Sequence, residues 1–235
     1  MKKISVVAHR GFSEKYPENT MLAFQKAARL GVEFIELDAR ETKDGEIVVI
    51  HDASVNRTTG AEGYVKELSF GEIKRLDAGK WKGFENAFVP SLDEVLQALH
   101  SKTKLLVEIK EASPRKIVKL VKKHGMEQSV IIGSFNIEYL VETRKTAPEI
   151  PTAFITGSMP ETPDILTVNG IEILDINYRR FERARAREFI QRGISLSVWT
   201  VDDEDDMKKL AGEEISFITT NRPDVLQKVL RSFAI

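Results

Sequence analysis

The stretch FIELDARETKDGEIVVIHD, residues 34–52, holds two apolar runs that a short polar segment separates. The first run is Phe34–Ala39 and the second is Ile47–Ile50, with Asp44-Gly45 between them. Asp-Gly is a strong signal for a tight turn, and a connection this short joins only antiparallel strands. We therefore predict a β-hairpin in which the first strand extends beyond its sheet and folds back on itself.

The position of the turn sets which residues of this hairpin face each other. If the turn is centred on Asp44-Gly45, Asp38 lies opposite His51. The hairpin would then return His51 to the neighbourhood of Asp38.

The rest of the chain repeats a short apolar or β-branched run followed by a helical stretch. Most runs are almost continuously hydrophobic, as expected for a parallel sheet that is covered on both faces. The runs are Ile4–Ala8, Phe34–Ala39, Leu105–Ile109, Val130–Ile132, Thr152–Ile155, Ile173–Ile176, Ser195–Trp199 and Ile215–Ile218. Helices are predicted over Thr20–Leu30, Leu92–Leu99 and Phe181–Gln191, between Ser113-Pro114 and Gly125, and from Asp202-Asp203 to Leu210.

This alternation places the chain in the α/β class. Eight strand–helix units in 235 residues fit a TIM-type (β/α)8 barrel. A doubly wound sheet is the alternative, but it typically has fewer strands, and no glycine-rich fingerprint follows the first run. Ile47–Ile50 is then a hairpin extension of the second strand. We expect residues 1–235 to form a single catalytic barrel domain, with a small capping insertion at approximately 52–90.

Composition excludes several classes of protein. The chain has 35 Lys and Arg against 36 Asp and Glu, a formal net charge of −1, which argues against a nucleic-acid partner. The apolar runs are too short to span a bilayer or to form a signal peptide, so we expect a cytoplasmic protein without a membrane span. With 0 cysteines, disulfides, thiolate zinc sites and cysteine nucleophiles are excluded.

The histidines fall into two groups. His100 and His124 follow predicted helices, where a cation interacts favourably with the helix dipole, so we interpret both as structural. His9 and His51 instead follow predicted strands and precede polar residues. Barrel enzymes carry their chemistry at the carboxyl ends of strands, so we expect His9 and His51 to meet at one functional rim.

Carboxylates lie on the strands beside these histidines. Glu36 and Asp38 are two residues apart and therefore share one face of their strand, and Glu108 and Lys110 repeat the spacing on the next barrel strand. Carboxylates inside a barrel repel one another unless a cation compensates them. The three of them predict an oxygen-ligand site for Mg²⁺ or Ca²⁺. The alternative is an outward-facing strand pair with Lys110 as a simple counter-charge.

Together these residues indicate metal-assisted acid/base chemistry in a barrel. Arg10 and Lys110, with a divalent cation, can hold a phosphate and offset charge in its transition state. Of two imidazoles that titrate near neutrality, one can accept a proton while the other donates one.

The order of motifs resembles that of the glycerophosphodiester phosphodiesterase family. The matching segments run along essentially the whole chain, in the family's order. They are Val7-Ala8-His9-Arg10-Gly11, Pro17-Glu18-Asn19-Thr20, Glu36-Leu37-Asp38, Val48–Asp52, Arg57-Thr58-Thr59-Gly60, Pro90–Leu96, Val107-Glu108-Ile109-Lys110, Ser134-Phe135, Val198-Trp199-Thr200 and Thr220–Asp224.

This resemblance implies a TIM-type barrel related to phosphatidylinositol-specific phospholipases C. It also implies hydrolysis of small-molecule glycerophosphodiesters to sn-glycerol 3-phosphate and an alcohol. Asn19 would be a rim residue or a helix N-cap, Glu18 would be structural, and Trp199 would line the glycerol pocket or pack in the core. The remaining roles carry over by motif: His9 and His51 as the acid/base pair, Glu36, Asp38 and Glu108 as metal ligands, and Arg10 and Lys110 as phosphate contacts.

Several alternatives stay open at this point. The nucleophile is the glycerol 2-hydroxyl, through a cyclic phosphate, or water. The activity could instead be of the lysophospholipase D type, although we expect Tyr64, Trp81, Phe84 and Phe88 of the insertion to pack on the barrel. A barrel that binds metal or phosphate without turnover, or an unrelated isomerase, fits the paired histidines poorly. The sequence assigns neither the ion, nor the acid and the base, nor the oligomeric state.

Overall fold

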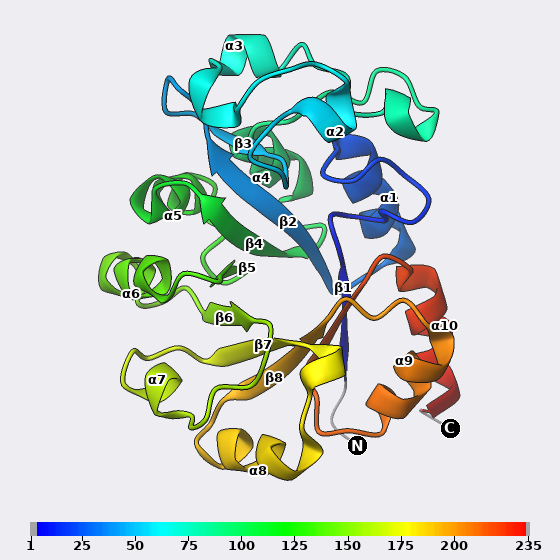
Figure 1. Ribbon diagram of the computed structural model, residues 1–235, viewed down its shortest axis with the longest axis vertical. Coiled ribbons are helices and arrows are strands. Elements are labelled where there is room, and N and C mark those ends of the chain that lie inside the picture. Colours follow the sequence, from blue (N-terminus) through cyan, green and yellow to red (C-terminus); the bar gives the residue numbers. More distant parts are fainter. Residues whose placement is uncertain (1–3, 234–235) are drawn as a thin grey trace.

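The computed structural model describes residues 4–233, which form a closed barrel of eight parallel strands with helices around it (Figure 1). The expected TIM-type barrel is confirmed. β1 pairs with both β2 and β9, and this pairing closes the ring. The barrel strands are β1 (Ser5–Ala8), β2 (Phe34–Glu41), β4 (Lys104–Glu111), β5 (Val130–Ser134), β6 (Thr152–Thr156), β7 (Ile173–Asn177), β8 (Ser195–Trp199) and β9 (Phe217–Thr220).

The last strand begins two residues later than the sequence predicts. Phe217–Thr220 is the segment that lies opposite Ser5–Ala8 of β1, with Ser5 facing Phe217 and Ala8 facing Thr220. Pairing with β1 therefore fixes the limits of this strand, and hydrophobicity alone does not.

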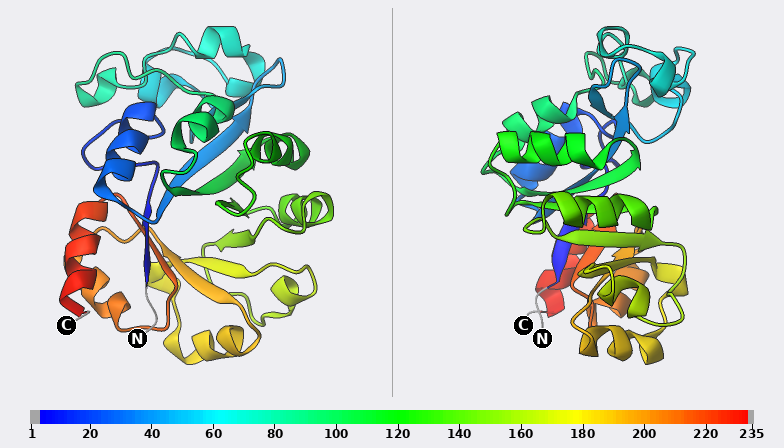
Figure 2. Two further views of the ribbon diagram at one scale, coloured as in Figure 1. Left: turned by 180° about the vertical axis from the view of Figure 1, so that it is seen from behind. Right: turned by 90° about the vertical axis from the view of Figure 1, so that its left-hand side faces the viewer.

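Helices surround the strands, as both views in Figure 2 show. Local signals set their ends. In α1 the Thr20 side chain accepts a hydrogen bond from the Ala23 amide, and the helix ends at Gly31 in a left-handed conformation. A capping box between Ser91 and Glu94 opens α4. The helices of this layer are α1 (Met21–Leu30), α4 (Leu92–Leu99), α5 (Pro114–Lys123), α6 (Ile137–Thr146), α7 (Asp164–Thr167), α8 (Arg183–Gln191), α9 (Glu204–Ala211) and α10 (Pro223–Phe233).

The inward faces of the strands change character along the barrel. Near the amino ends, one apolar cluster fills the interior. Alternate residues share a face, so Glu36 and Asp38 follow Phe34 on the inward face of β2, and Glu108 follows Leu106 on β4. The same strands thus supply the apolar residues of the packed floor and, further along, the polar residues of the mouth. The floor consists of Val7, Phe34, Leu106, Ile131, Ala153 and Ile173, with Phe217 against them.

The predicted hairpin is present, with a register that differs by one residue from the prediction. β3 (Ile47–Val49) runs antiparallel to β2, and Ala39 faces Val49. The Ile50 amide donates to the Asp38 carbonyl at 3.0 Å, so the residue opposite Asp38 is Ile50 and not His51, although His51 does lie in the neighbourhood of Asp38 as predicted. The loop has three residues, 43–45, and Gly45 takes the left-handed conformation at φ 84°.

Beyond β3 the insertion forms a small body with an apolar core of its own, at the top of Figure 1. Its short helices are α2 (Asn56–Thr59), η1 (Val65–Glu67), α3 (Phe70–Ile73) and η2 (Lys80–Lys82). The core is aliphatic and continues from the hairpin: Val48, Ile50, Val55, Val65, Ile73, Ala78 and Val89.

The expectation that the insertion's aromatic residues pack on the barrel is wrong for three of them. Tyr64, Trp81 and Phe88 are 54%, 45% and 44% exposed, because aliphatic side chains already fill the core beneath them. Phe84 is half-buried, with its ring 5.8 Å from that of Tyr16. Within residues 4–233, no helix combines the length and the apolar character that crossing a membrane requires.

Candidate active site

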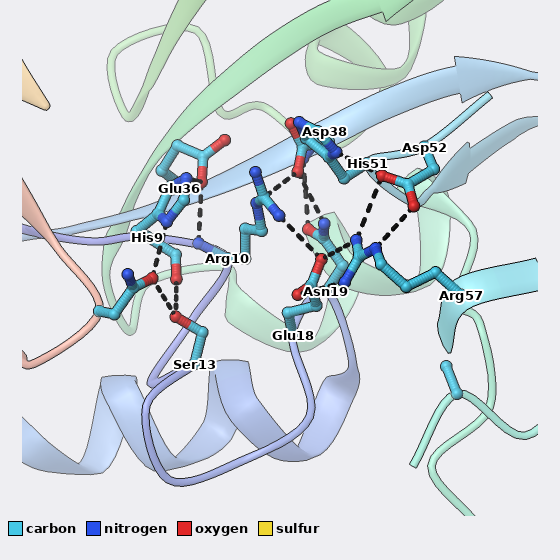
Figure 3. A network of polar contacts seen from close by, with 12 residues as sticks. His9, Arg10, Ser13, Glu18, Asn19, Glu36, Asp38, His51, Asp52 and Arg57 are labelled. Carbon is cyan, nitrogen blue, oxygen red and sulfur yellow. Dashed lines mark hydrogen bonds and ion pairs between the residues drawn. The ribbon is translucent and has the colours of Figure 1, made fainter. Parts of the chain in front are cut away.

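Three carboxylates meet at the mouth of the barrel, and Figure 3 shows two of them, Glu36 and Asp38. Asp38 of β2 lies directly opposite Glu108 of β4, and Glu36 precedes Asp38 on the same face. All three side chains are buried, and one oxygen of each lies within 4.8 Å of the others. The alternative of an outward-facing strand pair is therefore wrong.

The cluster has the character of a cation site. Burial and the repulsion of Asp38 and Glu108 raise the pKa of Glu36 well above its usual value, and burial beside Asp38 raises the pKa of Glu108 to about 7. Glu36 Oε1 is buried without a hydrogen-bond partner among residues 4–233. An unpartnered buried carboxylate oxygen, in a set of three carboxylates, fits a hard divalent cation such as Mg²⁺ or Ca²⁺.

Two cations of the protein flank Asp38. Arg10 Nε lies 3.2 Å from Asp38 Oδ2, and Lys110 Nζ lies 3.3 Å from Asp38 Oδ1 and 2.6 Å from Glu108 Oε1. Burial alone would raise the pKa of Asp38, but these neighbours outweigh it and hold that pKa below its ordinary value. Arg10 and Lys110, which Asp38 holds in place, are suited to bind an anion such as a phosphate.

His9 follows β1, and side chains that follow the neighbouring strands β9 and β8 orient it. Asn221 Nδ2 donates to Asp202 Oδ2 at 2.6 Å, which leaves Asn221 Oδ1 to face His9 Nδ1 at 2.7 Å. An amide oxygen only accepts, so His9 Nδ1 carries the hydrogen and Nε2 is free. Nε2 lies 3.9 Å from Glu36 Oε2. Burial and Arg10 lower the pKa of His9 to about 4, so the imidazole is neutral near pH 7.

His51 follows β3 at the opposite end of the carboxylate cluster, beside Asp38 (Figure 3). Its Nδ1 lies 2.7 Å from Asp52 Oδ1. Hydrogen bonds from Arg57 lower the pKa of Asp52 to about 2, so His51 faces an ionised carboxylate. Burial lowers the pKa of His51 itself, and Asp38 and Asp52 oppose that effect.

Glu18 and Asn19 belong to the site more closely than the sequence indicates. Glu18 accepts hydrogen bonds from Arg10 at 2.9 Å and from Arg57 at 2.7 and 3.0 Å. Asn19, at φ 54°, donates through Nδ2 to Asp38 Oδ2 at 2.7 Å. The N-cap of α1 is Thr20, so the interpretation of Asn19 as a helix cap is wrong.

Trp199, at the end of β8, lies half-buried at the same rim. Its indole Nε1 donates to the Asp175 carbonyl at 3.2 Å, and its ring meets that of Phe135 edge-on at 5.7 Å. Lys110 Nζ lies 5.6 Å from the Phe135 ring. The aromatic pair and the cationic cluster are therefore neighbours.

The sequence profile of the glycerophosphoryl diester phosphodiesterase family matches residues 9–225. The chain belongs to this family. A glycerophosphodiester phosphodiesterase from Caldanaerobacter subterraneus is 35% identical over 97% of this chain and 98% of its own. A crystal structure of the enzyme from Agrobacterium tumefaciens superposes with a TM-score of 0.88 at 31% identity, covering 96% of this chain and 100% of that one.

A second similar structure carries a ligand. It is a phosphodiesterase from Oleispira antarctica in complex with the product sn-glycerol 3-phosphate, with a TM-score of 0.89 at 26% identity over 97% and 96% of the two chains. Together, the family match and these relatives confirm the expectation of a phosphodiesterase.

The sequence predicts the principal charged groups of this site but not the residues that orient them. The sequence predicts no site role for Asp52, Arg57 or Asn221, although motifs that match the family contain all three, and it predicts Asp202 only as the start of a helix. Asp52 is the residue of this group that the sequence could most readily have indicated, because a carboxylate directly after a strand-end histidine can orient that histidine. The contacts of Arg57 and Asn221 join segments far apart in sequence, which spacing alone does not reveal.

Proposed function

We propose that this chain hydrolyses glycerophosphodiesters to sn-glycerol 3-phosphate and an alcohol, using a single catalytic domain that includes the insertion. The observation that carries the proposal is the placement of His9 and His51 at the two ends of one buried carboxylate cluster, with Arg10 between them (Figure 3) and Lys110 against Asp38. The product held by the Oleispira relative supports the same substrate class.

Arg10 and Lys110 bind the phosphate in this proposal. Both lie against Asp38, so they are partly neutralised in the free protein and are positioned before substrate arrives. Glu36, Asp38 and Glu108 would hold Mg²⁺ or Ca²⁺, which when bound supplies a Lewis acid that offsets the charge of the phosphate.

His9 is the general base and His51 the general acid. His9 presents an unprotonated Nε2, because its Nδ1 hydrogen is directed at Asn221. The partner of His51 is the ionised Asp52, which stabilises an imidazolium far better than an amide does. His9 would take the proton of the attacking hydroxyl, and His51 would protonate the alcohol oxygen as its bond to phosphorus breaks.

The attacking group is the glycerol 2-hydroxyl in this scheme, and the five-membered cyclic phosphate that forms is then opened by water. Direct attack by water uses the same two histidines. A diester without the 2-hydroxyl separates the two routes: equal turnover of that substrate contradicts the cyclic route, and trapping of the cyclic phosphate in a single turnover supports it.

We assign Trp199, with Phe135 beside it, to the glycerol moiety. Trp199 is half-buried and Phe135 is exposed, and the pair lies beside Lys110, so a glycerol group on the bound phosphate would reach it. Trp199→Ala should raise KM for every diester by a similar factor. A change that depended on the leaving alcohol would contradict this assignment.

The direct test is release of sn-glycerol 3-phosphate from glycerophosphocholine, with Mg²⁺ or Ca²⁺ and again with excess chelator. Product should require the cation and should disappear in His9→Ala and His51→Ala. His100→Ala is the matched control, because this histidine is the C-cap of α4 and, within the described residues, its ring contacts its neighbour Ser101 alone by a hydrogen bond. Folded protein that binds phosphate but releases no product with any divalent cation would indicate a barrel that binds without turnover.

A lysophospholipase D activity is the second candidate. A human lysophospholipase D is 26% identical over 97% of this chain, and three exposed aromatic residues on the insertion provide apolar surface. Faster turnover of lysophosphatidylcholine than of glycerophosphocholine would favour this candidate, and the reverse order would exclude it as the main activity.

A further inference from the structure

The guanidinium of Arg57 connects the insertion to two parts of the site, one at His51 and the other at Arg10. Arg57 is the second residue of α2 and donates to two different carboxylates (Figure 3). Nε and NH2 reach Asp52 at 2.6 and 3.2 Å, and NH1 and NH2 reach Glu18 at 3.0 and 2.7 Å. Two bidentate contacts from one side chain require the planar fork of arginine, which lysine lacks.

Each of these carboxylates has a second partner that the proposed reaction uses. Asp52 Oδ1 lies 2.7 Å from His51 Nδ1, and Glu18 Oε1 accepts from Arg10 NH1 at 2.9 Å. One branch from Arg57 therefore ends at the proposed proton donor. The other ends at a cation that contacts phosphate in the proposal.

The position of Arg57 is itself fixed by the insertion. Its neighbours Val55 and Thr58 are buried in or beside the insertion's apolar core, and α2 ends at Gly60 in a left-handed conformation. Glu18 belongs to the β1–α1 connection and Asp52 follows the hairpin, so three separate segments meet at this one side chain. Without Arg57, Glu18 and Asp52 would lack the cation between them and would repel each other.

We infer that Arg57 is a positioning residue that holds His51 through Asp52 and Arg10 through Glu18, which makes the insertion part of the catalytic machinery. The inference rests on the proposed function, because it needs His51 as proton donor. A plain structural tie between insertion and barrel would use the same contacts, so the test must separate positioning from a general loss of folded protein.

The leaving alcohol provides that separation. Choline leaves glycerophosphocholine only with a proton from the enzyme, whereas 4-nitrophenolate leaves the corresponding nitrophenyl diester without one. Arg57→Gln should lower kcat on glycerophosphocholine by about 10- to 100-fold, the usual cost of losing a group that orients a reacting residue. On the nitrophenyl diester kcat should fall less than about threefold, while KM rises for both substrates because Arg10 is also released.

The two branches can be tested one at a time. Asp52→Asn should reproduce the kcat effect that depends on the leaving group, and Glu18→Gln should reproduce only the common rise in KM. Arg57→Lys keeps the charge but loses the fork, so its kcat should lie between those of the wild type and Arg57→Gln. The matched control is Arg75→Gln, an exposed arginine elsewhere on the insertion, with both constants unchanged.

Equal losses of kcat on both substrates in Arg57→Gln would overturn the inference, as would unchanged kinetics in Arg57→Gln and Asp52→Asn. His51→Ala, measured alongside, tells the two failures apart. If His51→Ala discriminates between the leaving groups and Arg57→Gln does not, the positioning role alone is wrong. If His51→Ala slows both substrates equally, the assignment of the proton donor is wrong and the inference falls with it. Should Arg57→Gln fail to fold, Asp52→Asn decides by the same criterion.

Discussion

His9 at the end of the first barrel strand and Asn221 after the last one are joined by a 2.7 Å contact between Nδ1 and Oδ1, across the seam where the barrel closes. Asp202 accepts a hydrogen bond from the same amide and fixes it. The orientation of the imidazole therefore depends on a carboxylate that is not part of the buried carboxylate cluster. The proposed base is therefore held from outside the acidic cluster.

Removing this amide should slow catalysis without weakening binding. In Asn221→Ala the imidazole of His9 can rotate and change tautomer, so kcat should fall by about 10- to 100-fold while KM changes little. Asn169→Ala is the control, since its amide only donates to the Ile165 carbonyl at the end of α7. Steady-state kinetics on glycerophosphocholine measure both. Unchanged kcat in Asn221→Ala would show that this contact does not orient the base.

The acidic limb of the kcat/KM profile should lie below the ordinary imidazole value of 6.5 and toward pH 4, at saturating divalent cation. His9 must be neutral to accept a proton, so activity is lost as pH falls through its pKa, which burial lowers to about 4. Asn221→Asp places a carboxylate at Nδ1, stabilises the imidazolium and should move this limb to higher pH. A limb at the same pH in the wild type and in Asn221→Asp would contradict the assignment of His9.

Divalent cation should stabilise the fold, because it relieves repulsion among Glu36, Asp38 and Glu108. At about 100 times its dissociation constant the gain is about 2.7 kcal/mol. That gain corresponds to a rise in Tm of about 2–4 °C per kcal/mol in a domain of this size. Glu36→Gln should lose most of the rise, and the exposed Glu85→Gln should keep it. An equal rise in Glu36→Gln and the wild type would place the ion elsewhere.

Cation binding should also release protons near pH 6, since burial beside Asp38 raises the pKa of Glu108 to about 7 and a bound cation needs the ionised form. Calorimetric titration in two buffers with different heats of ionisation measures this release. Binding heats that do not depend on the buffer at pH 6 would contradict the raised pKa.

Asp175 should make stability fall as pH rises. It is buried on β7, and burial raises its pKa from 3.8 to about 7, with only partial opposition from Ser197. The folded protein thus holds a proton that the unfolded chain releases between those values, which costs on the order of 4 kcal/mol above pH 7. Asp175→Asn should raise Tm relative to wild type at pH 8 and not at pH 4. Parallel Tm curves would contradict the shift.

The hairpin turn should be sensitive at Gly45. Its φ of 84° is strained for other residues, and an added Cβ would come within 2.5 Å of Lys116 Nζ. Gly45→Ala should destabilise the protein by about 1–2 kcal/mol in denaturant unfolding. Gly71→Ala, where the added atom meets nothing closer than 4.0 Å and no positive φ is required, is the control and should change stability little.

The barrel and the principal charged groups could be predicted from sequence because their signals are local. Alternation at period two puts Glu36 and Asp38 on one face, and strand ends put His9 and His51 at one rim. These properties belong to short segments, and tertiary contacts do not override them.

The register of the hairpin, the contacts that orient the charged groups and the exposure of the insertion's aromatic residues depend on tertiary geometry, which the spacing of residues in the sequence does not encode. The hairpin slipped by one residue because Gly45 completes a three-residue loop, where Asp44-Gly45 alone suggests a two-residue one. The ties of Asn221 to His9 and of Arg57 to Glu18 span 212 and 39 residues. Closure of the barrel brings the first pair together, and the contact of the insertion with the β1–α1 connection brings the second pair together. Tyr64, Trp81 and Phe88 of the insertion are exposed because its aliphatic residues already form a core.

The seam between β1 and β9 also has a consequence for biosynthesis. The acidic cluster and both flanking cations are complete once residue 110 has been added, yet the side chain that orients His9 comes from residue 221. A nascent chain therefore carries a charged but unaligned centre until its last strand has left the ribosome and docked. In the proposed mechanism, full activity in diester cleavage requires the closed ring, so the first fast turnover of a newly made molecule reports the end of its folding.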